Sequence, residues 1–157
     1  MGDAMTTAAT TSANRVPSHT APNVNERIRN KAIDSIRHYA QNPAGIGERL
    51  RELDREWDVE RALETGSSVL SLTGLAIGYL ITPWGYLLTL VVQGFFLQHA
   101  LQGWCPPLPV FRRKGFRTRD EIDRERFALK AIRGDFDGIS GAGAMTAPRA
   151  YEAAERN

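Results

Sequence analysis

Residues 66–111 read GSSVLSLTGLAIGYLITPWGYLLTLVVQGFFLQHALQGWCPPLPVF and decide the fold, because they contain no Asp, Glu, Lys or Arg. Two apolar runs, residues 67–81 and 86–101, are separated by residues 82–85 (TPWG). Proline removes a backbone donor and glycine tolerates positive φ, so this tetrapeptide predicts a turn between two antiparallel helices. The rest of the 157-residue chain is too small and too charged to bury both helices. The stretch therefore predicts an all-α protein with a membrane hairpin of two transmembrane helices.

The lengths of the two helices differ. Trp84 and Trp104 would lie about 30 Å apart in a helix, close to the hydrocarbon thickness of a bilayer, and a tryptophan at each end is typical of interface anchors. The first helix, from Gly66 to Ile81, would be only about 22 Å long. It spans a bilayer only if the membrane thins locally or flanking residues enter the interface. A re-entrant hairpin that does not cross fully stays open as an alternative.

Charged segments flank the hairpin on both sides. Helical spacing of apolar residues predicts amphipathic helices at residues 25–40 and 47–65, and three prolines within residues 105–109 predict an extended exit from the second apolar helix. We expect five regions: a disordered tail (1–22), an amphipathic helical region (23–65), the hairpin (66–111), a basic stretch with a helix (112–137) and a second disordered tail (138–157).

The basic stretch sets the expected orientation. The turn of the hairpin carries no charge, whereas cytoplasmic basic anchors follow its second helix, namely Arg112, Arg113, Lys114 and Arg117. By the positive-inside rule, both termini would lie in the cytoplasm, as in a multi-pass protein of a bacterial inner membrane. Beyond this stretch, Thr118 and Glu121 form a capping-box pattern that predicts a helix start, and Gly134 predicts its end near Arg133.

Small residues form a ridge on the first apolar helix, namely Ser67, Ser71, Gly74 and Gly78. In lipid, such residues let helix backbones approach closely. Two interpretations stay open: a contact between two copies of the chain, or packing on the second helix of the same hairpin.

The second apolar helix carries four polar residues, namely Gln93, Gln98, His99 and Gln102. Polar groups at membrane depth need partners. Hydrogen bonding between helices or at the interface is favoured over a ligand, proton or metal site. A metal site would need a second histidine from another subunit or His38, so we predict no metal and no cofactor.

Cys105, the only cysteine, lies at the expected cytoplasmic boundary. Neighbouring arginines would favour its thiolate, which could act as a nucleophile or a persulfide carrier. However, Pro106, Pro107 and Pro109 have no N–H groups to cradle an anion. A structural cysteine in a turn is therefore the favoured interpretation, and we do not expect a complete sulfurtransferase site in this chain.

Gly103-Trp104-Cys105-Pro106 closes the second apolar helix, and with this motif residues 67–115 resemble the YgaP-like inner-membrane domain, a two-helix domain of unknown function. That domain ends its second helix in Gly-x-Cys, often followed by Pro, so Gly103, Cys105 and Pro106 match the motif. The resemblance implies a dimeric membrane hairpin. Fused members carry a rhodanese with the catalytic cysteine, and this sequence contains no such domain.

We therefore expect a non-enzymatic, self-associating membrane anchor or interaction module. Its expected partners are the lipid bilayer, a second copy of the chain and a cytoplasmic protein, and not a nucleic acid, since the net charge is only +2. The alternative hypothesis is an accessory protein in sulfane-sulfur handling that uses Cys105.

Overall fold

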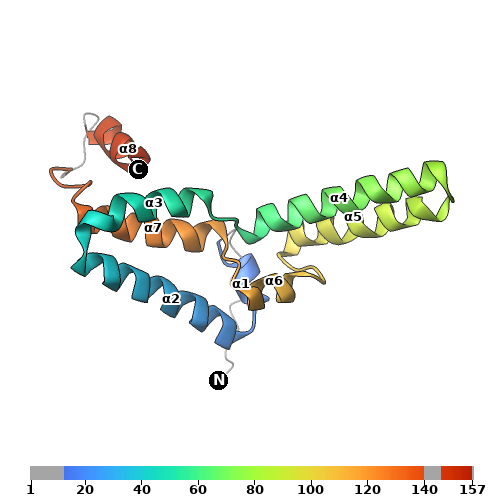
Figure 1. Cartoon of the computed structure of the whole chain (residues 1–157), viewed down its shortest axis with the longest axis horizontal. Coiled ribbons are helices and arrows are strands. Elements are labelled where there is room, and N and C mark those ends of the chain that lie inside the picture. Colours follow the sequence, from blue (N-terminus) through green and yellow to red (C-terminus); the bar gives the residue numbers. More distant parts are fainter. Residues whose placement is uncertain (1–12, 140–145, 157) are drawn as a thin grey trace, which may run out of the picture. The chain divides into compact units, whose positions relative to one another are not determined.

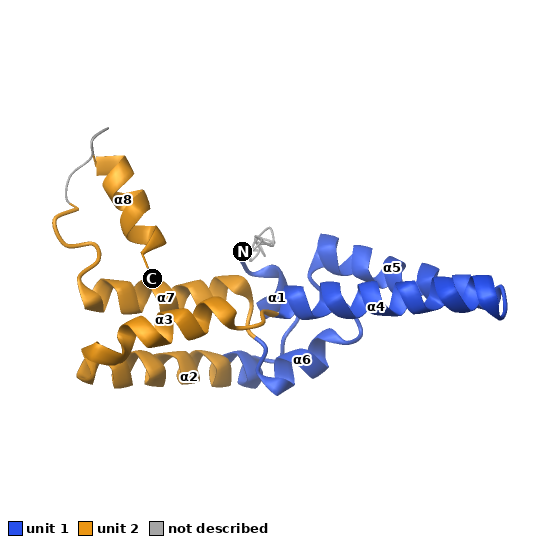
Figure 2. Cartoon of the chain, turned by 45° about the horizontal axis from the view of Figure 1, so that its top comes forward, with its two compact units in different colours: residues 1–25, 59–116 blue, residues 26–58, 117–157 orange. Residues whose placement is uncertain are grey.

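The computed structural model describes residues 13–139 and 146–156, and every regular element in these ranges is helical, which confirms the all-α prediction (Figure 1). The chain divides into two compact units, shown in blue and orange in Figure 2. Unit 1 comprises residues 1–25 and 59–116, and unit 2 comprises residues 26–58 and 117–157. Helix α2 (Pro22–Gln41) contributes its first residues to unit 1 and the rest to unit 2.

Unit 1 is built around the hairpin of α4 (Val59–Leu80) and α5 (Trp84–Gln102), which run side by side (Figure 1). The N–H groups of Ile81 and Thr82 donate to Ile77 O and close α4, and Gly85 N–H donates to Thr82 O as α5 begins. The turn thus lies where the sequence predicts it. None of the helices in the described ranges combines the length and the apolar character that a membrane crossing requires.

Glycines let the two helices of the hairpin pack closely. A Cβ atom at Gly74 would come within 2.5 Å of Thr89 Oγ1, and one at Gly78 within 2.7 Å of the Tyr86 ring. Gly85 faces them from α5, where a Cβ would meet the backbone of Gly74 and Gly78. Because any side chain here would force the helices apart, these positions fix the distance between α4 and α5.

At the base of the hairpin, unit 1 contains an apolar core and a short N-terminal helix, α1 (Arg15–Ser18). Val16 is buried against core residues from α4 and from the segment after α5. Arg15 Nη1 donates to Ala100 O at 2.6 Å and so satisfies a carbonyl in the last turn of α5. The prediction of a disordered tail over residues 1–22 is therefore wrong for residues 13–22, while residues 1–12 lie outside the described ranges.

Helix α6 (Leu108–Lys114) was not expected from the sequence. The prolines of residues 105–109 predict an extended chain, but α6 begins within them. Pro109 lies in the first turn of the helix, where its missing N–H would have no intrahelical partner, so it is tolerated there. Gly115, at φ 96°, ends α6.

Unit 2 contains the rest of α2, a short 3-10 helix η1 (Pro43–Gly45), α3 (Ile46–Arg55), α7 (Arg119–Arg133) and α8 (Thr146–Glu155). Its core is the contact of α3 with α7 and consists of Ile46, Leu50, Leu53, Ile122 and Leu129. The helix expected over residues 25–40 is confirmed as α2.

The single helix expected over residues 47–65 is wrong, because the chain leaves α3 at Glu56 and α4 starts only at Val59. Glu56 has an extended backbone (φ −63°, ψ 132°), and its carboxylate accepts from Arg117 Nε at 2.7 Å. An ion pair to a residue far along the chain thus accompanies a break that local helix propensity does not indicate.

The predicted bounds of α7 are confirmed. Thr118 Oγ1 accepts from Glu121 N–H at 3.2 Å, while Glu121 Oε2 accepts from Thr118 N–H at 2.8 Å, which is a capping box. Gly134, at φ 84°, ends the helix.

The disordered tail expected over residues 138–157 is wrong for residues 146–155, which form α8. Ala153 of this helix is buried, and Lys130 Nζ of α7 donates to Ala154 O at 2.5 Å. A lysine that satisfies a carbonyl at the end of another helix is a tertiary contact that the composition of the tail does not reveal. Residues 140–145 and 157 lie outside the described ranges.

Candidate functional site

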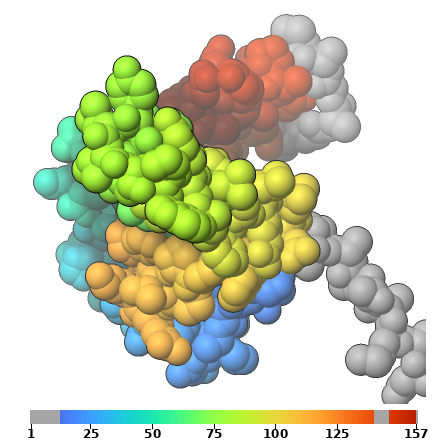
Figure 3. Space-filling view, turned by 90° about the vertical axis from the view of Figure 1, so that its right-hand side faces the viewer, coloured from blue at the N-terminus to red at the C-terminus, as the bar shows by residue number. Residues whose placement is uncertain are grey.

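The outward faces of the α4–α5 hairpin expose large apolar side chains. On α4, Leu72 is 66% and Leu80 74% exposed, and on α5, Leu90 is 72% and Leu101 74% exposed. Figure 3 views the hairpin from its end, with α4 in green against α5 in yellow. The surface carries no charged side chain from Gly66 to Gln102. An exposed apolar surface of this extent marks a contact with lipid or with another protein.

Three polar side chains of the hairpin, by contrast, take part in hydrogen bonds between its two helices. Thr89 Oγ1 donates to Ser71 O at 3.0 Å, and Gln93 Nε2 donates to Ser71 Oγ at 2.7 Å. The small-residue ridge predicted on α4 thus meets α5 of the same chain at Ser71, Gly74 and Gly78. Ser67 lies farther down α4, where its hydroxyl donates to Glu64 O.

The other polar residues of α5 lie toward its C-terminal end and behave differently from one another. His99 is buried, and neither of its ring nitrogens has a hydrogen-bond partner among the described residues. Gln98 is half-buried and Gln102 is exposed. In the part of the chain that the structure describes, no three His, Cys, Asp or Glu side chains gather as a metal site would require.

The Gly-x-Cys-Pro motif has a structural explanation. Gly103 ends α5 at φ 76°, and a Cβ atom there would lie within 2.6 Å of the Arg15 backbone. Both its conformation and this close approach favour glycine. Cys105 is buried in the core of unit 1, and Pro106 lies beside it at the edge of a cavity.

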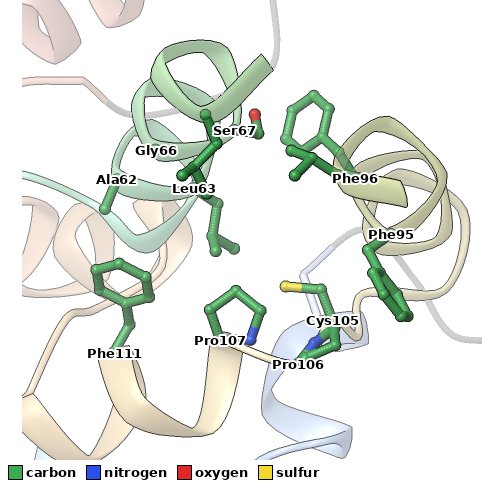
Figure 4. A pocket seen from close by; sticks show the side chains of 12 residues that line it. Ala62, Leu63, Gly66, Ser67, Phe95, Phe96, Cys105, Pro106, Pro107 and Phe111 are labelled. Atoms are coloured by element: carbon green, nitrogen blue, oxygen red, sulfur yellow. The ribbon is translucent and has the colours of Figure 1, made fainter. Parts of the chain in front are cut away.

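This cavity, of about 330 Å³, lies at the base of the hairpin (Figure 4). Its walls come from α4, α5, the loop after α5 and α6, and they are almost entirely apolar. The side chains that define it include Leu63, Leu70, Phe95, Phe96, Cys105 and Phe111. Figure 4 shows that the sulfur of Cys105 points into this space.

The surroundings of Cys105 favour the neutral thiol. Burial raises the pKa of Cys105, and a hydrogen bond with the backbone of Leu108 offsets this only in part. Arg112, one of the arginines expected to stabilise a thiolate, is engaged elsewhere: its Nε donates to Thr20 Oγ1 and its Nη2 to Asn25 Oδ1, at 3.1 and 2.9 Å. The structure therefore places Cys105 in an apolar setting rather than an electropositive one.

The predicted basic group divides into buried and exposed members. Arg112 is fully buried and joins α6 to Thr20, which precedes α2, and to Asn25 in the first turn of α2, and its Nη1 also donates to Phe116 O. Arg117 is buried in unit 2. Only Arg113 and Lys114 are exposed. Spacing alone does not distinguish these roles, because all four residues follow the hairpin within a short basic run.

The two predicted tryptophan anchors also differ. Trp84 is 76% exposed at the first residue of α5, beside the turn of the hairpin. Trp104 is half-buried and packs against the core of unit 1.

Sequence reasoning missed a cluster of buried charges in unit 2, centred on Glu125 of α7. The Glu125 side chain is fully buried and accepts from Ser35 Oγ at 2.6 Å, Arg49 Nε at 3.0 Å and Arg117 Nη1 at 2.5 Å. Burial acts to raise the pKa of Glu125, but these hydrogen bonds outweigh it and lower the pKa. The partners come from segments far apart along the chain, so the sequence offers no local signal for the cluster.

Comparisons with protein-family models, with curated proteins and with solved structures found no match to this chain. The resemblance of residues 67–115 to the YgaP-like domain therefore stays a prediction.

Proposed function

We propose that the protein is a self-associating membrane anchor whose α4–α5 hairpin is embedded in a lipid bilayer. The observation that carries this proposal is the inverted distribution of polarity in the hairpin: Ser71, Thr89 and Gln93 bond between the helices, while large apolar side chains face outward. In water, such a surface drives aggregation, because exposed apolar area is unfavourable. Lipid tails remove this penalty, and polar groups that bond between the two helices, as Gln93 does although its side chain is exposed, need no water.

The lengths of the helices bear on the depth of insertion. Helix α5 has 19 residues and a length of about 28 Å, which approaches the hydrocarbon thickness. The charge-free part of α4, from Thr65 to Leu80, extends about 23 Å. For α4 to cross fully, the membrane must thin locally or residues that flank the helix must enter the membrane interface. A re-entrant hairpin requires neither.

The orientation follows from the exposed charges next to the hairpin. Arg113 and Lys114 come soon after α5, whereas residues 81–83 between the helices are uncharged. The positive-inside rule then places both ends of the hairpin on the cytoplasmic side of a bacterial inner membrane. An anchor of this kind would present charged helices to a cytoplasmic protein partner.

Self-association is proposed on the outer face of α5. The ridge of Gly74 and Gly78 is already covered by α5 of the same chain. In contrast, Leu87, Leu90, Gly94, Leu97 and Leu101 recur at alternating spacings of three and four, which is the seam of a left-handed helix pair. A Cβ atom at Gly94 would meet no other atom within 4 Å, so this seam is open to the helix of a second copy.

The alternative, a carrier of sulfane sulfur, has weaker support. A carrier needs a reactive thiolate, whereas the neutral thiol of Cys105 is favoured by burial. The same apolar surroundings are consistent with a structural role for the Gly103-x-Cys105-Pro106 motif.

Insertion can be tested with the tryptophan beside the turn. A variant that retains only Trp84 (Trp57→Phe, Trp104→Phe) is reconstituted into vesicles whose phosphatidylcholine carries bromine at a defined acyl depth. We expect strong quenching of Trp84. A matched variant that retains only Trp57, which follows α3, should be quenched little.

The depth profile separates the two modes of insertion. Strongest quenching by bromine near the acyl-chain ends would place the turn at the bilayer centre, as in a re-entrant hairpin. Strongest quenching near the headgroups would favour full crossing. An unquenched Trp84, in a protein that stays monodisperse in buffer without detergent, would refute the anchor.

A further inference from the structure

We infer that the cavity at the base of the hairpin binds one acyl chain of an anionic phospholipid, whose phosphate group is held by Lys114. This inference rests on the proposed membrane function and names a ligand for a cavity that anchoring itself does not use. Three features carry it: the chemistry of the walls, the position of Lys114 and the way α6 is fixed.

The walls suit an alkyl chain. They are formed by aromatic, aliphatic and proline side chains, and the polar atom that Ser67 contributes is already used, since its hydroxyl donates to Glu64 O. The volume of about 330 Å³ lies at the lower end of the range for ligand pockets. Apolar cavities stay dry and take up apolar ligands, because water finds no hydrogen-bond partner in them.

Charge complementarity decides which lipid fits. Pro107 and Phe111 line the cavity, and Lys114 follows Phe111 at the spacing of one helical turn, so these three residues share one face of α6. Lys114 is exposed and extends this face beyond the apolar walls. A long lysine stem packs along apolar surface and places its ammonium group at the polar interface, where it meets a phosphate.

Helix α6 is held in the orientation that this arrangement needs. The buried guanidinium of Arg112 donates to Thr20, Asn25 and Phe116, on contacts that lie within unit 1. Because Arg112 fixes one side of this short helix, the face that carries Phe111 is turned to the cavity, and helical spacing puts Lys114 on the same face. The site is thereby preorganised rather than formed by the lipid.

The test uses the full chain in detergent micelles doped with phosphatidylglycerol or with phosphatidylcholine of the same acyl chains. Native mass spectrometry counts the lipids that each protein retains. We expect the wild type to retain one phosphatidylglycerol and to prefer it over phosphatidylcholine. Equal retention of the two lipids would overturn the inference.

Gly66 offers a variant that fills the cavity without disturbing its neighbours. It lies in the cavity wall, and a Cβ atom there would meet nothing within 4 Å. Gly66→Leu should therefore abolish retention of phosphatidylglycerol, whereas the matched variant Gly66→Ala should retain it. Retention by Gly66→Leu at the level of the wild type would refute the site.

The charge is tested separately. Lys114→Gln should lower the preference for phosphatidylglycerol roughly fivefold, because one basic side chain near a lipid surface contributes about that factor. Lys31→Gln, which removes an exposed lysine of unit 2, should leave the preference unchanged. A loss of preference in both variants, or in neither, would contradict the assignment of Lys114.

Cys105 gives a second readout that does not depend on any variant. Its sulfur points into the cavity, and it is the only cysteine, so a small apolar maleimide reports on this site alone (Figure 4). Phosphatidylglycerol should slow the modification of Cys105, and an unchanged rate would overturn the inference. Quenching of Trp84 by brominated lipid with no lipid retained would refute the cavity ligand alone, whereas an unquenched Trp84 would refute the anchor as well.

Discussion

The α4–α5 hairpin and the α3–α7 pair are both helix pairs, but they distribute polarity in opposite ways. In the hairpin, Ser71 and Gln93 bond to each other at the contact, and Leu90 faces outward. In the α3–α7 pair, Leu50 and Leu129 are fully buried at the contact, and charged side chains cover the outside. A helix buries the groups that its surroundings solvate poorly, so the proposed lipid environment of the hairpin would account for this difference.

The comparison also shows two ways of fixing a helix contact. Glycines set the distance between α4 and α5, as they do where no hydrophobic driving force brings helices together. The α3–α7 pair instead combines an apolar core with the buried carboxylate of Glu125. We therefore expect added side-chain atoms at the glycines to disrupt the α4–α5 contact, and the loss of a charged partner to disrupt the α3–α7 contact.

The largest expected effect comes from removing that carboxylate. Glu125→Ala leaves Arg49 and Arg117 without their shared buried acceptor, and we expect a loss of about 3–5 kcal/mol in the free energy of unfolding of unit 2. The measurement is urea unfolding in mild detergent, followed by Trp57 fluorescence after Trp84 and Trp104 are replaced by Phe.

Glu52 provides the matched control. It also pairs with Arg49, at 2.9 Å, but its side chain is 54% exposed. Glu52→Ala should therefore change the free energy of unfolding by about 0–1 kcal/mol. Equal effects of the two substitutions would mean that the Glu125 cluster is not a buried element of unit 2.

A second prediction makes the same truncation in both regions. Leu129→Ala should destabilise unit 2 by about 2–5 kcal/mol, because it leaves a cavity in the α3–α7 core. Leu72→Ala removes the same atoms from a side chain of α4 that is 66% exposed and lies outside the proposed contact between copies, so unfolding of the hairpin should change by less than about 0.5 kcal/mol. A large loss at Leu72 would show that this face of α4 is covered by another protein rather than by lipid.

Local signals in the sequence were enough to predict several elements. The charge-free run and the TPWG turn indicated the hairpin, and the capping box at Thr118 with the stop at Gly134 gave the bounds of α7. These features depend on residues within a few positions of one another. The hairpin's inner contacts followed as one of two interpretations of the small-residue ridge.

Other features depend on contacts between distant residues and could not be predicted. The break at Glu56 coincides with its ion pair to Arg117, and α8 docks through Lys130 of α7. The buried role of Arg112 depends on Thr20 and Asn25, far earlier in the chain. The cavity beside Cys105 likewise requires three separate segments to meet, so the sequence revealed the cysteine but not its surroundings.

A third prediction distinguishes the contact between α4 and α5 of one chain from the proposed contact between two copies of the chain. Gly74→Leu should weaken the packing of α4 on α5 by about 1–3 kcal/mol, because its side chain would overlap Thr89 and the backbone of Gly85. The readout is resistance of the helical circular dichroism signal to added SDS.

Gly94→Leu is the matched substitution on the outer face of α5, where a Cβ meets no other atom. It should leave that signal unchanged and instead reduce chemical crosslinking between two copies of the chain. Crosslinking that is lost with Gly74→Leu but kept with Gly94→Leu would move the contact between copies to the α4 ridge.

The smallest expected effect concerns the polar bond inside the hairpin. Gln93→Leu removes its bond to Ser71 Oγ, and a double-mutant cycle with Ser71→Ala should give a coupling of only about 0.6 kcal/mol, the average for such bonds in membranes. Ser35→Ala removes a bond to the Glu125 carboxylate and should cost about 1.5–3 kcal/mol, since bonds to buried charges are stronger. Both are measured by unfolding in the same micelles. A coupling at Gln93 that matches the loss at Ser35 would mean that Gln93 has no alternative partners in the unfolded hairpin, which would contradict the proposed lipid environment of these helices.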